Sequence, residues 1–105
     1  MTRKRFTAVL LDGHKGAAVE VPFDPAVTWR IDAVPVFPGR RGHFVRGTFN
    51  DVPFQSCVVS RMRRFWLLVS NDLRVAAGAR IGSRANVSVE PMSGASKTSR
   101  GTRGA

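Results

Sequence analysis

The stretch "RRGHFVRGTFNDVPF" (residues 40–54) predicts the central hairpin of a small β-protein. Side chains alternate between the two faces of a strand, so Val45 and Phe49 share one face of residues 42–49. Asn50 and Asp51 then predict a two-residue hairpin turn, because both residue types tolerate a left-handed backbone. The chain is therefore expected to return antiparallel to its first strand after this turn.

Apolar runs predict five further strands, at residues 5–11, 17–21, 52–59, 65–69 and 85–89. A short helix is expected at residues 71–79, with Ser70 or Asn71 as its N-cap. Strands this short, joined by turns of hairpin length, predict an all-β barrel or sandwich.

The chain has 105 residues, which is room for one domain. Residues 24–41 contain three prolines and predict a long connection. We expect this connection to fold back over the core, because an exposed loop would not keep Trp29 and Phe37. Residues 1–5 are interpreted as a basic arm, and the Gly/Ser/Thr-rich residues 92–105 as a disordered basic tail.

The central hairpin also begins like the RNP1 signature of RNA-recognition motifs, with Arg-Gly at residues 41–42. That motif stacks bases on aromatic residues two positions apart on one face of a sheet. Phe44 and Phe49 are an odd number of residues apart and must face opposite sides. We therefore exclude that motif, while a small barrel that binds nucleic acid through a basic, aromatic face stays open.

The net charge is +10, from 17 Lys and Arg against 7 Asp and Glu. Six of the basic residues lie near the two ends of the chain: Arg3, Lys4, Arg5, Lys97, Arg100 and Arg103. The remaining 11 basic and 7 acidic residues leave a net charge of +4. Basic arms attract polyanions without sequence preference, and solubility alone is the alternative reading. The candidate polyanion contacts are Arg3, Lys4, Arg5, Arg46, Arg61, Arg63 and Arg64.

Catalytic and metal chemistry receive no support from the sequence. His14, His43 and Cys57 are isolated, whereas metal sites need clustered ligands. Cys57 is interpreted as a small buried hydrophobe, and no nucleophile-elbow, P-loop or dinucleotide motif occurs. We therefore expect a non-enzymatic protein without a cofactor. The alternative is a small-molecule or catalytic site at the barrel mouth, lined by Trp29, Phe37, Phe65 and Trp66 with Cys57 or His43 nearby.

The single cysteine excludes a disulfide within the chain and favours a reducing, cytoplasmic location. No apolar run approaches the ~18 residues of a membrane span, so no membrane partner is expected. Nucleic acid or another polyanion is the expected partner. A homodimer is the other candidate assembly, because the edge strands of an open barrel can pair between copies.

Four ordered segments carry a family resemblance: "AAVEVPFD" (residues 17–24), "RGHFVRGTFNDVPFQS" (41–56), "NDLRVAAGARIG" (71–82) and "ANVSVEP" (85–91). Together they resemble the DUF1905 family, a small bacterial β-barrel domain of unknown function, over residues 6–91. The chain departs from the family pattern in its long 24–41 connection and in Ser83. It also departs at Asn50 and Asp51, where Asp-Gly or Asn-Gly is typical.

The resemblance implies a mainly β fold, a small six-stranded pseudo-barrel of the double-split β-barrel type with one short helix. In such a tightly curved sheet, Gly42 and Gly47 are expected to permit close backbone approach or bulges. The family has no established activity, so the resemblance assigns no ligand. We therefore expect a non-catalytic binding module.

Overall fold

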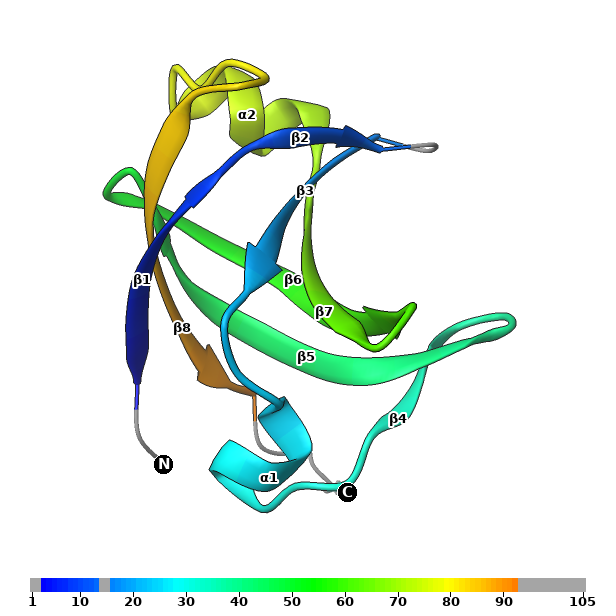
Figure 1. The fold of residues 1–105 in the computed structure, drawn as a ribbon. Helices are drawn as coiled ribbons and strands as arrows, with labels where there is room; N and C mark the ends of the chain where they lie inside the picture. Colours follow the sequence, from blue (N-terminus) through cyan, green and yellow to red (C-terminus); the bar gives the residue numbers. More distant parts are fainter. Residues whose placement is uncertain (1–2, 14–15, 93–105) are drawn as a thin grey trace, which may run out of the picture.

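The computed structural model describes residues 3–13 and 16–92, which form a curled antiparallel sheet with two short helices (Figure 1). The strands in this part of the chain are β1 (Lys4–Val9), β2 (Leu11–Gly13), β3 (Gly16–Val21), β4 (Val34–Phe37), β5 (Arg40–Phe49), β6 (Val52–Arg61), β7 (Arg64–Val69) and β8 (Arg84–Pro91). The helices are α1 (Pro25–Trp29) and α2 (Asn71–Ala76). The predicted mainly β, barrel-like fold is confirmed.

The sheet curls round so that its two end strands, β1 and β2, are joined through a single residue, Leu10. Its strand order is β1-β8-β5-β6-β7-β3-β2, and β4 pairs with β5 off this path. The end strands β1 and β2 follow each other in the chain and are separated only by Leu10, which is fully buried. The loop before β8 holds this bend, because Leu10 N–H donates to Ser83 O and Leu10 O accepts from Gly82 N–H. The strand expected at residues 5–11 is thus broken at Leu10 into β1 and β2.

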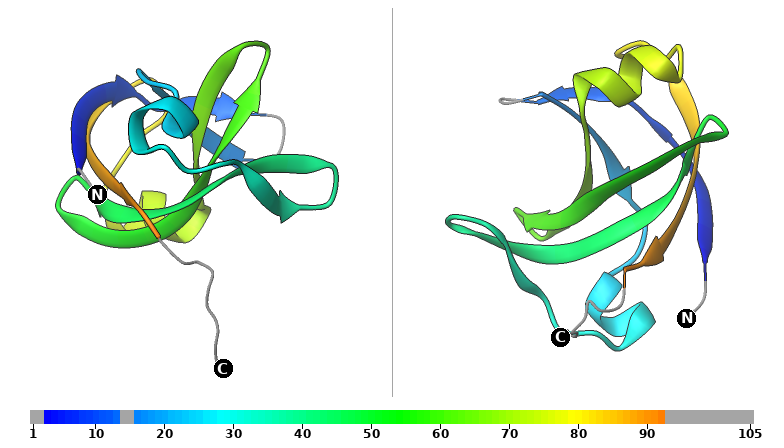
Figure 2. Two further views of the ribbon diagram at one scale, coloured as in Figure 1. Left: turned by 90° about the horizontal axis from the view of Figure 1, so that it is seen from below. Right: turned by 180° about the vertical axis from the view of Figure 1, so that it is seen from behind.

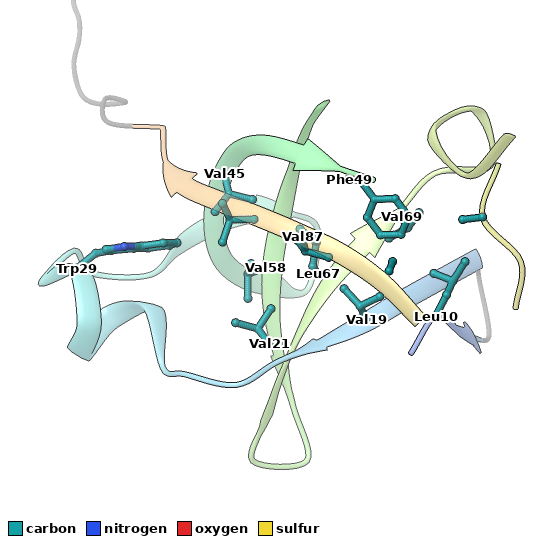
Figure 3. Packing of buried hydrophobic residues seen from close by; sticks show 13 residues of the cluster. Leu10, Val19, Val21, Trp29, Val45, Phe49, Val58, Leu67, Val69 and Val87 are labelled. Carbon is teal, nitrogen blue, oxygen red and sulfur yellow. The ribbon is translucent and has the colours of Figure 1, made fainter. Parts of the chain in front are cut away.

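The core fills the inside of the curled sheet (Figure 3). Val45 and Phe49 are fully buried there, and Val19 and Val21 of β3 and Ala85, Val87 and Val89 of β8 are buried too, so the predicted alternation of faces is confirmed. The buried cluster consists of Leu10, Val19, Val21, Trp29, Val45, Phe49, Val58, Leu67, Val69, Ala79, Ala85, Val87 and Val89.

Two close backbone approaches along β5 lie at glycines. A Cβ atom at Gly42 would overlap the carbonyl oxygen of Val58, and one at Gly47 would overlap that of Ser88. Neither glycine has a positive φ, so the requirement is space rather than backbone freedom. The predicted close backbone approach is confirmed at both positions. It lets β5 pair with β6, β8 and β4.

Two hairpin turns have the same left-handed conformation. Asn50 and Asp51 have φ values of 48° and 69°, which confirms the predicted turn. Met62 and Arg63, between β6 and β7, have φ values of 53° and 66°. Both turns therefore have the twist that suits a two-residue hairpin.

Helix α2 begins where the sequence predicts. Ser70 Oγ accepts the N–H of Leu73 at 3.1 Å, which confirms Ser70 as the N-cap. The helix ends at Ala76, shortly before Gly78, whose φ is +64°.

The connection at residues 24–41 differs from the predicted loop, because it contains α1 and β4. Asp24 Oδ1 caps α1 through the N–H of Ala26 at 3.0 Å, and α1 carries Trp29 into the core. The expectation that the segment covers the core is therefore confirmed for Trp29. It is wrong for Phe37, which is 42% exposed at the tip of the β4–β5 hairpin. Figure 2 shows this hairpin projecting from the barrel.

We expect Gly47→Ala to destabilise the fold by more than about 3 kcal/mol, because the methyl group collides with the backbone of the paired strand. Gly78→Ala is the matched control. Its Cβ meets nothing within 4 Å, so its cost is only the about 1 kcal/mol of a left-handed alanine. Denaturant unfolding of both variants measures the difference, and equal losses would contradict the role given to Gly47.

Candidate polyanion-binding surface

Five arginines lie on the β4–β5 and β6–β7 hairpins, whose ends lie on the same side of the barrel in Figure 1 and point apart in Figure 2. Antiparallel pairing of Gly42 with Val59 places the start of β5 beside the end of β6. Arg40 bridges the two strands, since its Nη1 donates to Ser60 O at 3.4 Å. We call this set the hairpin-end surface, and it comprises Arg40, Arg41, Arg61, Arg63 and Arg64.

The local structure keeps these guanidinium groups at the surface. The tight turn at Met62 and Arg63 presents both side chains to solvent, and Met62 is 85% exposed. Arg41 Nη2 donates to Ala33 O at 2.7 Å, so its guanidinium is held in place. Arg64 lies 3.6 Å from Glu20, and both side chains are largely exposed. Such a surface pair is weak, so it leaves Arg64 available to a stronger anion.

A groove of about 620 Å³ lies along the β4–β5 hairpin and joins this surface. Phe37 and two prolines give it an apolar wall, and Arg40 and Arg41 border it. Guanidinium groups such as those of Arg40 and Arg41 bind phosphate and carboxylate by a fixed fork of donors.

The structure divides the seven predicted contacts between separate places. Arg61, Arg63 and Arg64 belong to the hairpin-end surface, and Lys4 and Arg5 begin β1. The predicted arm of residues 1–5 therefore reaches into the sheet. The predicted tail lies outside the described residues from position 93 onward, as does His14.

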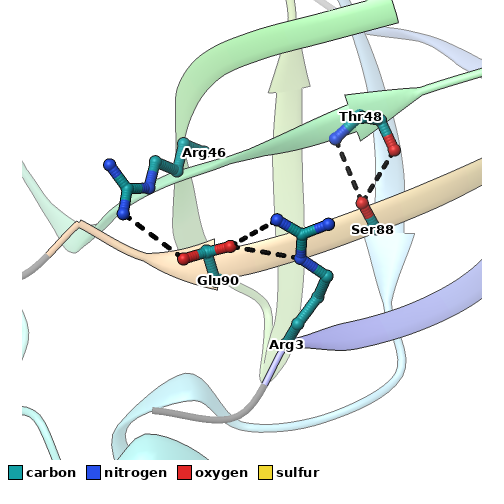
Figure 4. Close-up of polar contacts among 5 residues, drawn as sticks. All are labelled: Arg3, Arg46, Thr48, Ser88 and Glu90. Atoms are coloured by element: carbon teal, nitrogen blue, oxygen red, sulfur yellow. Dashed lines mark hydrogen bonds and ion pairs between the residues drawn. The ribbon is translucent and has the colours of Figure 1, made fainter. Parts of the chain in front are cut away.

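Arg3 and Arg46 meet on a shared carboxylate, that of Glu90 (Figure 4). Arg3 donates to Glu90 Oε1 from Nη2 at 2.6 Å and from Nε at 3.1 Å. Arg46 Nη2 lies 3.4 Å from Glu90 Oε2. The hydrogen bond from Arg3, with a further contribution from Arg46, holds the pKa of Glu90 below its usual range. Glu90 therefore stays charged and cancels half of the positive charge at this place.

Beside this ion-pair group, Ser88 and Thr48 bond across β8 and β5 (Figure 4). Ser88 Oγ accepts the N–H of Thr48 at 3.1 Å and lies 2.7 Å from Thr48 Oγ1. These polar groups are satisfied within the sheet and offer nothing to a ligand.

Sequence reasoning missed Arg40 and Arg41. They lie in the stretch interpreted as a loop before the first strand of the central hairpin, and no local pattern pairs them with Arg61. The signal that could have found them is the hairpin register itself. Extending the pairing of residues 50–51 backward places the basic residues before Gly42 opposite those after Val59.

The residues predicted for a barrel-mouth site lie apart. Trp29 is inside the core, Phe37 is on the projecting hairpin, and Trp66 lies on the outer side of β7. His43 is buried, and its Nε2 lies 2.6 Å from Ile31 O, which ties the segment after α1 to β5. Burial raises the pKa of the Cys57 thiol, so it stays protonated and is a poor nucleophile.

A second hollow, of about 300 Å³, lies between β6 and α2. Its two serine hydroxyls already have structural partners, since Ser56 Oγ donates to Leu68 O and Ser70 Oγ caps α2. Residues 3–13 and 16–92 contain no group of three His, Cys, Asp or Glu that could hold a metal ion. No helix in these same ranges is long and apolar enough to cross a membrane.

The family model described as "Domain of unknown function (DUF1905)" matches residues 6–89. The chain belongs to the DUF1905 family. The resemblance seen in the sequence is therefore confirmed. The match covers both hairpins of the DUF1905 barrel and ends one residue before Glu90. No curated protein matches the chain.

Glu90→Gln is expected to lower stability at neutral pH, and this loss should shrink as the pH falls. A carboxyl whose pKa is lowered by folding stabilises the fold above its unfolded pKa of about 4.3. That contribution disappears as the pH drops through the folded value, where the native carboxylate protonates too.

Denaturant unfolding at neutral pH and at about pH 3 measures the effect. Glu20→Gln is the control, because the Glu20–Arg64 pair is longer and more exposed, so its loss at neutral pH should be smaller. A Glu90→Gln effect of the same size at both pH values would contradict the assignment of the ion pairs.

Proposed function

We propose that this DUF1905 domain is a non-catalytic module that binds nucleic acid through the hairpin-end surface. The observation that carries the proposal is that five arginines lie at the ends of two neighbouring hairpins, with Glu20 the one carboxylate that the structure pairs with them within the described residues. Guanidinium groups bind phosphates through parallel hydrogen bonds, and each phosphate neutralised releases condensed counterions. The affinity for nucleic acid then comes from contacts with its phosphates, which are the same in every sequence.

The positive charge of the whole molecule also supports this proposal. The net charge of +10 attracts a polyanion from a distance, and salt screens that attraction. Arg3 and Arg46 add little, because Glu90 holds both of them. We infer a cytoplasmic location as well, since a single buried cysteine is suited to a reducing compartment that also contains nucleic acid.

We expect the double variant Arg61→Gln/Arg63→Gln to bind nucleic acid more weakly and with a shallower salt dependence. The slope of log K against log salt should fall by about 0.9 for each duplex phosphate that the variant no longer neutralises, and by about 0.7 for each single-strand phosphate. Fluorescence anisotropy with duplex and single-stranded oligonucleotides over a salt series measures this slope. Both side chains are exposed, so the fold should be retained.

The charge-matched control is Arg80→Gln/Arg84→Gln. Both arginines are exposed and flank the loop before β8, at the opposite end of the barrel (Figure 1). Equal slopes in the two double variants would mean that net charge alone drives binding, and would refute the hairpin-end surface. Absence of binding by the full-length protein at low salt would refute the proposed function as a whole.

A further inference from the structure

An apolar patch lies on the outer side of β5, β6 and β7, away from the core. Strand pairing sets Phe44 opposite Cys57 and Val59 opposite Trp66. Their neighbours in sequence, such as Val45, Val58 and Leu67, face inward and form the core cluster, to which none of these four belongs. We call Phe44, Cys57, Val59 and Trp66 the outer apolar face.

The two aromatic residues are the accessible part of this face. Phe44 is 43% exposed and Trp66 is half-buried, whereas Cys57 and Val59 between them are nearly fully buried. Phe44 and Trp66 lie on strands separated by β6, and they are offset by two positions along the sheet, which places their backbones about 12 Å apart. Two rings at this spacing can each take a separate base.

Arginines border the outer apolar face at both ends. Arg46 follows Phe44 by two positions and so shares its side of β5. Arg61 and Arg64 pair with each other two positions beyond Val59 and Trp66. Two carboxylates neighbour this rim: Glu90 accepts from Arg46 at 3.4 Å, and Glu20 forms an ion pair with Arg64 at 3.6 Å.

The positive charge of the bordering arginines decides which kind of molecule can bind on this face. A second copy packed on it by two-fold symmetry would bring its own Arg61 and Arg64 against an arginine rim, and like charges would repel. A single-stranded nucleic acid instead supplies phosphates for the arginines and free base faces for the rings. A duplex supplies the phosphates but keeps its base faces stacked inside.

We propose that the outer apolar face is a stacking platform for unpaired bases, which gives the domain a preference for single-stranded nucleic acid over duplex. This inference rests on the proposed function, because the hairpin-end arginines Arg61 and Arg64 supply the backbone contacts at its border. The proposed function and this inference depend on different side chains. The arginines determine the salt dependence of binding, and the rings of Phe44 and Trp66 determine the preference for single strands.

The decisive variant is Phe44→Leu, which keeps an apolar side chain and removes the aromatic ring. Its affinity for an oligothymidylate of about 12 nucleotides should fall about 5-fold or more. Its affinity for a duplex of the same length and its salt slope should stay unchanged. Phe44→Tyr should restore the single-strand affinity, and Val75→Ala, an exposed apolar residue on α2, should leave both affinities unaltered.

Tryptophan fluorescence gives a second readout. Stacking on Trp66 should quench its emission when the oligothymidylate binds, while Trp29 stays inside the core. Trp66→Phe should abolish the quenching and keep the affinity within about 3-fold, because a ring that can stack remains.

The outcomes separate the two proposals. Equal affinity for single strand and duplex, or an unchanged Phe44→Leu variant, would overturn the stacking platform, while the arginine variants would still decide the proposed function. A dimer in light scattering that Phe44→Leu dissociates would assign the face to a second copy and overturn the inference. No binding to either oligonucleotide at low salt would overturn both.

Discussion

The fold depends on two places where backbone meets backbone without an intervening side chain. At Gly42 and Gly47, strand β5 approaches the carbonyl oxygens of β6 and β8 more closely than any Cβ would permit. These contacts let one ten-residue strand bend while it stays hydrogen-bonded on both edges. A side chain at either position would push β5 away from the strand that it pairs with.

The bend also decides what lies on the surface. Curling divides each strand into an inward apolar row and an outward row, and the outward rows of β5, β6 and β7 carry arginines beside aromatic residues. It also sets the two hairpins on one side of the barrel. Glu90 keeps Arg3 and Arg46 apart from this assembly by binding them both. The place of a basic residue in the fold therefore decides whether a carboxylate of the protein pairs with it or leaves it open to a ligand.

The sequence predicted those features that depend on local patterns. Alternation in β5, the turn at Asn50 and Asp51 and the cap at Ser70 each arise within a few residues. Helix α1 and strand β4 have five and four residues, too few to establish a period, and they were interpreted as loop. Parity correctly separated Phe44 from Phe49. Trp66 shares the outer face with Phe44 two strands away, which only the register across β6 reveals.

The bend at Leu10 has a consequence for how the chain is made. Strand β1, the first to be synthesised, pairs with β8, the last, and β8 also covers one edge of β5. On a ribosome, the earlier strands must wait with open edges until residues 84–91 emerge, and loop closure over this distance slows folding. The nascent barrel is therefore exposed to edge-to-edge association for nearly its whole synthesis. Closure of the ring is the step that ends this exposure.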